Sequence, residues 1–361
     1  MSRVTITTLA EDLSLSVCTI NKALNDKPGV SADTRRRVKE TALRLGYRPN
    51  RLAQALASPP LSIGVVYPDA WQSHYGLLVD GVRREIDALQ DHHLSADYRV
   101  VHGFANGAAF VGAVQDLVDA GVNGMIISLG MYDLCFRQKA WKVLSESQIP
   151  HVLLGTECVH AAPLTCVWTD GYRSGRVAGE LLGWVVGEQS VAVLIGSREN
   201  LEHQNKIAGL QDELSRCGLT LAGVYETQDE PGLAAPVAQQ AFAEHPNLGG
   251  LYIATENVGG VGSFLADAGL AGKVHVVATG KSPEVLQLLH DGILQCSLFQ
   301  NEDQQGAMAV SVLHEWLQSG RRPEREMRVP PVVLLRNTVD LWMGREVTRA
   351  GSGRDQEDTA D

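Results

Sequence analysis

The 361-residue sequence lacks the signatures of membrane proteins, secreted proteins and metalloproteins. It has no apolar run long enough to span a bilayer, and its first residues open no secretory signal segment. The six cysteines are scattered without CxxC or metal-finger spacing, which indicates reduced thiols in a cytoplasmic protein. HExxH, P-loop and Gly-x-Ser-x-Gly motifs are also missing. These absences favour a cytoplasmic protein that is not an enzyme, with no catalytic residues, no metal and no cofactor.

Basic residues are few overall, but their distribution is uneven. The whole chain has a net charge of −11. Through Ser58 the sequence has ten Lys and Arg against five acids, so this segment carries +5 and the remainder −16. A basic module on an acidic body is typical of nucleic-acid-binding proteins, because only the module attracts phosphates. We expect any contact with DNA to be confined to the first 58 residues.

Residues 5–25 have the pattern of two short helices joined by a tight turn. Apolar residues fall at helical spacing in two sets, namely Ile6, Leu9, Ala10 and Leu13, then Val17, Ile20, Ala23 and Leu24. Ser16 stands where an N-cap belongs, just before the second set. This layout is typical of a helix-turn-helix, whose second helix enters the major groove, although an ordinary helical hairpin has the same pattern.

A third helix is predicted over residues 32–45, capped by Ser31 and stopped by Gly46. Short motifs follow one another through this region, namely Leu24-Asn25, Lys27-Pro28-Gly29-Val30-Ser31, Thr34-Arg35-Arg36-Arg37-Val38, Leu45-Gly46-Tyr47-Arg48-Pro49-Asn50, Leu52-Ala53 and Leu56. In order and spacing they resemble the headpiece of the LacI/GalR family of bacterial transcription regulators. The chain departs from that family at Ser14, where a turn glycine is usual, and at residues 19–22, which read Thr-Ile-Asn-Lys instead of Thr-Val-Ser-Arg.

The resemblance implies a set of residues that contact operator DNA. They are Thr5, Ser16, Val17, Cys18, Thr19, Asn21, Lys22, Asn25, Ser31, Thr34, Asn50, Ala53 and Leu56. Asn50 to Ala57 is too short to hold a helix unaided, so it needs support. In the resembled family this hinge helix pairs with a second copy and inserts a leucine into the minor groove, which implies that role for Leu56. A plain linker is the alternative.

From Leu61 the pattern changes to apolar strands that alternate with amphipathic helices. The predicted strands span 62–67, 98–103, 124–128 and 151–154 in a first half, then 191–195, 220–225, 250–254 and 274–278 in a second half. Such alternation indicates parallel sheets covered on both faces. We therefore expect an α/β core of two doubly wound parallel-sheet subdomains, and the resemblance implies a periplasmic-binding-protein-like arrangement.

The predicted organisation has four parts. A small all-α helix-turn-helix headpiece occupies 1–48, a hinge helix and linker 49–60, an effector-binding core 61–345, and a disordered tail 346–361. Within the core we expect the N-subdomain at about 61–157 and 296–325, and the C-subdomain at about 162–292 and 328–343. The chain then crosses between subdomains near Cys158, Gly292 and Arg325.

Doubly wound sheets bind ligands at the carboxyl ends of their strands. The candidate effector-binding residues there are Asp69, Trp71, Gln72, His74, Tyr75, Ser128, Glu157, Lys206, Asn257, Lys281 and Gln300. Planar polar groups and aromatic faces suit a sugar or polyol. Lys206 stands where the family has a ligand-clamping arginine, and Gly155 and Asn257 replace acids that are usual there. Two lysines and fewer acids also suggest a sugar acid or sugar phosphate. Taken singly, each candidate side chain is equally consistent with a structural role.

The resemblance implies a homodimeric, sequence-specific DNA-binding transcriptional regulator, more often a repressor in that family. Its affinity for double-stranded operator DNA would be controlled allosterically by a small sugar-like effector. We expect a cytoplasmic, nucleoid-associated protein without a membrane partner. The alternative from another class is a cytoplasmic sugar-binding or sugar-modifying protein whose headpiece is degenerate.

Overall fold

A computed structural model describes residues 4–24, 28–47, 59–103, 106–128, 134–157, 162–230, 232–255 and 257–344. Four of the predicted DNA contacts, Asn25, Asn50, Ala53 and Leu56, lie outside these residues, as does the predicted tail. In the described part of the chain, no helix is both long and apolar enough to cross a membrane.

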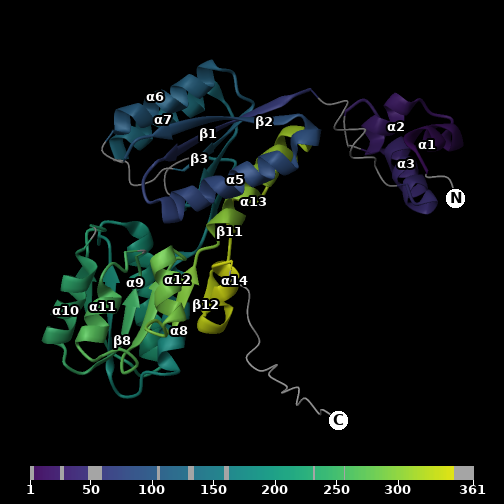
Figure 1. The fold of residues 1–361 in the computed structure, drawn as a ribbon. Helices are drawn as coiled ribbons and strands as arrows, with labels where there is room; N and C mark the ends of the chain where they lie inside the picture. Colours follow the sequence, from purple (N-terminus) through teal and green to yellow (C-terminus); the bar gives the residue numbers. More distant parts are fainter. Residues whose placement is uncertain are drawn as a thin grey trace, which may run out of the picture.

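The headpiece is a small bundle of helices α1 (Ile6–Leu13), α2 (Val17–Leu24) and α3 (Ala32–Leu45) (Figure 1). Its core is built on Leu9, Ile20 and Val38, which are fully buried. The turn between α1 and α2 is made by Ser14 in the left-handed conformation, with a φ of 53°. Serine therefore adopts the conformation for which the resembled family usually has glycine, at a modest steric cost.

The first half of the core is a parallel sheet with strand order β11-β5-β4-β3-β1-β2. Its strands are β1 (Leu61–Pro68), β2 (Leu94–Val101), β3 (Gly124–Ile127), β4 (His151–Leu154), β5 (Thr165–Trp168) and β11 (Glu326–Arg328). One face is covered by α5 (Leu77–Ala88) and α13 (Glu302–Ser319), and the other by α6 (Gly107–Asp119) and α7 (Leu134–Ser147) (Figure 1). Short helical turns η1 (Gln72–Gly76) and η2 (Gln90–His92) precede and follow α5.

The second half repeats this order as β12-β10-β9-β8-β6-β7, with β12 antiparallel to β10. Its strands are β6 (Ser190–Ile195), β7 (Leu221–Glu226), β8 (Leu248–Ile253), β9 (His275–Thr279), β10 (Cys296–Phe299) and β12 (Val332–Leu335). Helices α8 (Gly171–Gly183) and α9 (Leu201–Arg216) cover one face. The other face packs against α10 (Ala234–Glu244), α11 (Val261–Asp267), α12 (Pro283–His290) and, after the turn η3 (Arg336–Thr338), α14 (Val339–Trp342).

In each half, two helices cross on glycines. A Cβ added at Gly81 in α5 would lie 2.0 Å from the backbone oxygen of Asp303, and one at Gly306 in α13 would lie 2.0 Å from that of Leu78. In the second half, Gly175 of α8 and Gly209 of α9 make the equivalent approaches, at 2.0 and 1.9 Å from backbone oxygens. These crossings place α9 and α13 close against their neighbours, and both helices begin at the carboxyl ends of the sheets.

The predicted fold class is confirmed, but the predicted subdomain boundaries are wrong in two places. The C-subdomain was expected to begin at about 162, yet β5 pairs with β4 in the first sheet. Residues 296–325 were assigned to the N-subdomain, yet β10 pairs with β9 in the second sheet. The chain crosses after Trp168, after Phe299 and between β11 and β12. A four-residue apolar strand has the same pattern in either sheet, so only its pairing decides the assignment.

Candidate functional site

Helix α2 turns a polar face outward and an apolar face into the headpiece. Ile20 and Ala23 are fully buried. On the opposite side Cys18, Asn21 and Lys22 are exposed, and Val17 is 44% exposed. Short polar side chains on an exposed helix can approach base edges and phosphates closely, as a recognition helix requires.

Several predicted DNA contacts also have capping roles. The Ser16 hydroxyl accepts a hydrogen bond from the Thr19 backbone N–H at 3.1 Å, and the Ser31 hydroxyl does the same for Thr34 at 3.2 Å. Thr5 caps α1 in the same way. Because Ser/Thr hydroxyls satisfy otherwise unpaired N–H groups at helix starts, these residues fix the helices whether or not they touch DNA. The outward residues Cys18, Asn21 and Lys22 have no such capping role.

The second predicted site lies at the carboxyl ends of the two sheets, and we call it the carboxyl-end site. In the first half, His74 of η1 has its Nδ1 at 3.1 Å from Oε1 of Glu302, the first residue of α13. Glu302 is fully buried, and its Oε2 has no hydrogen-bond partner among the described residues. Beside them Trp71, left-handed with a φ of 41°, stacks on Tyr75 with ring centroids 6.1 Å apart.

In the second half, Lys206 is already engaged within the protein. Its side chain is 2% exposed, and its ammonium lies 2.7 Å from Oε1 of Glu202 and donates to the backbone oxygen of Ala254 at 3.0 Å. Burial by itself would raise the pKa of Glu202, but the charges of Lys206 and His203 and the hydrogen bond from Lys206 together outweigh it and lower the pKa to about 2. The charge of this lysine is therefore neutralised by a neighbour.

Contacts join the two halves at this site. Asn205 of α9 donates from Nδ2 to Oε1 of Glu157, which follows β4, at 3.1 Å. Leu77, the first residue of α5, packs against the hydrophobic cluster of the second half. Burial raises the pKa of Glu157. The carboxyl ends of the sheets therefore face each other, as in a two-lobed binding protein.

Two other predicted effector-binding residues make hydrogen bonds within the protein. Asp69 binds His102 and accepts from the backbone N–H of Gly103 at 3.0 Å, and the His102 hydrogen bond lowers its pKa. Asn257 donates to the backbone oxygen of Glu230 at 2.7 Å and so braces its own loop. These two side chains tie loop segments together.

Lys281 lies over aromatic rings, with Nζ at 4.1 Å from the Phe299 centroid and 4.8 Å from that of Trp342. The hypothesis of an anionic ligand rested on Lys206 and Lys281. Lys206 is paired with Glu202, whereas the aromatic rings leave the charge of Lys281 unneutralised, so only one of the two lysines keeps its charge for an anion.

The remaining candidates differ in accessibility. Gln72 is exposed at the start of η1. Ser128 is buried, and its hydroxyl has no hydrogen-bond partner among the described residues. Gln300 is buried, and its backbone oxygen accepts from Thr169 at 2.7 Å and from Gln305 at 2.8 Å. It therefore helps to fix the crossing between the halves.

Sequence reasoning missed three acidic or amide groups of this site, namely Glu202, Asn205 and Glu302. One signal was available, since Glu202 precedes Lys206 by four residues on one helix, the spacing of an ion pair. The pairing of Glu302 with His74 joins residues 228 positions apart and leaves no local signal. Within the described residues, no group of His, Cys, Asp and Glu is arranged to hold a metal ion.

Comparison with known proteins places this geometry in a family. The family model described as "Periplasmic binding protein domain" matches residues 63–322. Catabolite control protein A of Staphylococcus aureus is 26% identical over 293 residues, which cover 79% of this chain and 81% of that protein. The HTH-type transcriptional regulator GalS of Salmonella typhimurium is 26% identical over 287 residues, covering 77% and 79%.

Solved structures agree on the fold. The crystal structure of a periplasmic ribose ABC transporter from Conexibacter woesei superposes with a TM-score of 0.72 at 18% identity, covering 80% of this chain and 96% of that one. The chain belongs to the periplasmic binding protein domain family, in the LacI/GalR group of transcriptional regulators that its headpiece residues resemble.

Proposed function

We propose that this protein is a repressor that binds a pseudo-palindromic operator as a homodimer. The observation that carries the proposal is the outward face of α2, where Cys18, Asn21 and Lys22 are exposed while Ile20 anchors the helix in the headpiece core. A helix held in this way can lie in the major groove with its polar face against base edges. Two headpieces in a dimer then read two half-sites.

The segment after the headpiece is proposed to complete the interaction. Paired hinge helices would enter the minor groove, with Ala53 at their contact and Leu56 between the central base pairs. Unstacking of bases is offset in such complexes because bent DNA touches more protein. This part of the proposal rests on the family resemblance of residues 49–57.

The proposed effector is an uncharged, hydroxyl-rich molecule such as a sugar or polyol, bound at the carboxyl-end site. The second Glu302 oxygen and the Ser128 hydroxyl are buried without a partner among the described residues, so an effector hydroxyl that reached them would satisfy an unused hydrogen-bonding capacity. Trp71 and Tyr75 supply an aromatic surface for the C–H face of a ring. Lys206 is neutralised by Glu202, which removes one of the two cations that would favour a sugar acid or a sugar phosphate.

Regulation would follow from closure of the two halves around the effector. The Asn205–Glu157 hydrogen bond is a contact that such a movement would make or break. By linkage, the effector and DNA must change each other's affinity by the same factor, typically about 5- to 150-fold.

The test of DNA binding is footprinting of the full chain on the DNA that flanks its own coding region, at two salt concentrations. We expect a protected pseudo-palindrome whose affinity falls steeply with salt, because each neutralised phosphate contributes about 0.9 to the logarithmic slope. Lys22→Ala should weaken binding and reduce the slope. Lys142→Ala, which removes an equal charge from exposed helix α7, should change neither.

A sugar-binding protein with a degenerate headpiece is the competing function, favoured by the sugar-binding proteins among the similar structures. It predicts effector binding without any footprint. Calorimetry with neutral sugars, sugar acids and sugar phosphates tests the ligand class separately. Binding of anionic members alone would contradict the uncharged effector.

A further inference from the structure

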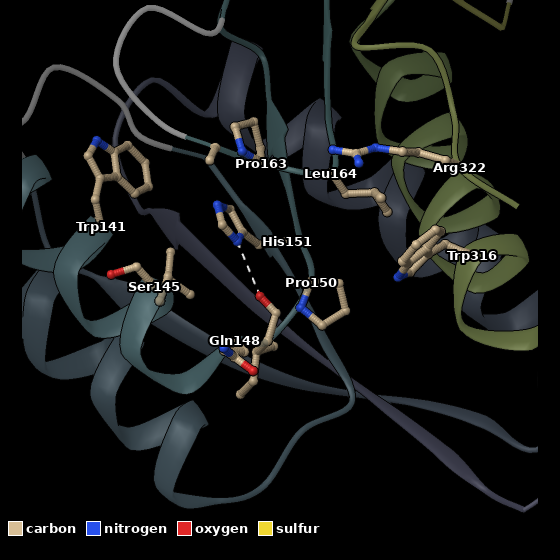
Figure 2. Close-up of a pocket in the computed structure, with 12 residues that line it drawn as sticks. Trp141, Ser145, Gln148, Pro150, His151, Pro163, Leu164, Trp316 and Arg322 are labelled. Carbon is tan, nitrogen blue, oxygen red and sulfur yellow. Dashed lines mark hydrogen bonds between the residues drawn. The ribbon is translucent and has the colours of Figure 1, made fainter. Parts of the chain in front are cut away.

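A pocket away from the carboxyl-end site has the features of a second ligand site. It has a volume of about 290 Å³ and is lined by the end of α7, the start of β4, the segment before β5 and the end of α13 (Figure 2). These are the amino ends of the strands, so the pocket and the carboxyl-end site lie at opposite ends of β4. The volume is at the lower end of the usual range for ligand pockets and suits a molecule of about one ring with short substituents.

Besides Ser145 and Gln148, the pocket is lined by a buried polar group, His151, the first residue of β4. Its side chain is largely buried, and Nδ1 lies 3.2 Å from the backbone oxygen of Ile149. Since a carbonyl oxygen can only accept, Nδ1 carries the proton there. Burial lowers the pKa of His151, so the ring is neutral at pH 7 and Nε2 carries a lone pair. Nε2 is buried and has no hydrogen-bond partner among the described residues.

An unmet lone pair inside a protein is costly, and it specifies a ligand that donates a hydrogen bond. Two tryptophans contribute to the otherwise mainly aliphatic walls. Trp141 stacks on His151 with centroids 6.2 Å apart and planes 15° from parallel, and Trp316 lines the pocket from α13. Such walls can stack on a flat aromatic ring.

The charged group is Arg322, just beyond α13. Figure 2 shows its guanidinium extending over Leu164 toward the pocket. Its neighbour Arg321 pairs with Glu315 at 3.1 Å and does not line the pocket, whereas Arg322 has no carboxylate partner among the described residues. A guanidinium at the rim of an apolar pocket is suited to hold a carboxylate.

We propose that this pocket binds a hydroxylated aromatic carboxylic acid. The ring packs among Trp141, Trp316 and Pro163, the hydroxyl donates to Nε2 of His151, and the carboxylate pairs with Arg322. The site is separate from the proposed effector site, and its binding does not depend on the headpiece. It makes the core a receptor for two chemically different ligands.

Calorimetric titration of the full chain with 2-, 3- and 4-hydroxybenzoate, and with benzoate, tests the site. We expect at least one hydroxybenzoate to bind more tightly than benzoate, and a saturating neutral sugar not to compete. Arg322→Gln should weaken binding by about 10-fold or more, the loss typical of a hydrogen bond to a charged group. The matched control Arg321→Gln should leave it within about twofold, as expected for a surface ion pair.

His151→Phe should abolish the preference for hydroxybenzoate over benzoate while benzoate binding stays. If His151→Phe does not fold, the difference in binding between Arg322→Gln and Arg321→Gln tests the proposal. Failure of all four acids to bind at millimolar concentration would overturn the proposal, and so would binding that Arg322→Gln leaves unchanged.

Discussion

In the first half of the core, Glu302 is held by a histidine, whereas in the second half Glu202 is held by a lysine. Both halves have the same strand order and the same kind of glycine crossing. The histidine makes one contact with its acid and leaves the second carboxylate oxygen without a partner in the described structure. The lysine also donates a hydrogen bond to the backbone oxygen of Ala254, so both of these contacts are made within the protein. The first half therefore keeps one buried carboxylate oxygen without a partner among the described residues, whereas the acid of the second half is paired with a buried ammonium.

The largest expected effect is at the glycine crossings, which both halves share. Gly81→Ala and Gly209→Ala should each lower the free energy of unfolding by about 3 kcal/mol, because the new Cβ would lie about 2 Å from a backbone oxygen and force two helices apart. Denaturant unfolding measures the change.

Gly112→Ala is the control, since Gly112 lies on the exposed side of helix α6 and nothing lies within 4 Å of the added Cβ. It should stabilise by roughly 0.5–1 kcal/mol through helix propensity. An equal change in the free energy of unfolding of all three variants would mean that the helix crossings can accommodate an added Cβ.

The next largest effect is expected from the Lys206–Glu202 pair, which belongs to the second half only. Lys206→Met should lower the free energy of unfolding by about 2 kcal/mol, because it leaves the Glu202 carboxylate and the Ala254 carbonyl without their partner. Adding Glu202→Gln should recover part of the loss, which a double-mutant cycle would show. If the losses in the free energy of unfolding from the two single variants simply add in the double variant, the Lys206–Glu202 interaction does not contribute to stability.

A smaller effect is expected in acid. The pKa of Glu202 is about 2 in the folded protein and 4.5 ordinarily, so the folded state favours its charged form. Its contribution is complete above about pH 4.5 and is lost as the pH falls toward 2. Solvent screening limits it to about 1 kcal/mol, since the side chain is 30% exposed. Unfolding of the wild type and Glu202→Gln across this range should converge at low pH; a constant difference would refute the assignment.

The smallest effect concerns the contact between the halves. Asn205→Ala removes the hydrogen bond to Glu157 and should cost about 0.5–1 kcal/mol while altering effector affinity. Gln204→Ala removes a bond of the same kind to the Arg198 backbone within the second half alone. Gln204→Ala should leave effector affinity unchanged. An equal change in effector affinity in both variants would mean that the Asn205–Glu157 hydrogen bond does not couple the two halves.

Local patterns in the sequence determined much of this protein. Helical spacing and caps such as Ser31 predicted the headpiece helices, and alternating apolar runs predicted most of the parallel strands, because these depend on neighbours a few residues apart. Motif order likewise predicted the regulator family. The exposed face of α2 followed from the same periodicity.

Tertiary structure alone decided which strands share a sheet and which side chains meet. The assignment of β5 and β10 depends on pairing with strands far along the chain. His74 meets Glu302 only because α5 and α13 cross on glycines, and Lys206 loses its availability because it is buried beside Glu202. The pocket around His151 gathers residues from three separate segments, 141–151, 162–164 and 316–322. Apart from the Glu202–Lys206 pair, whose four-residue spacing is local, these contacts depend on the packed fold and no local pattern of residues encodes them.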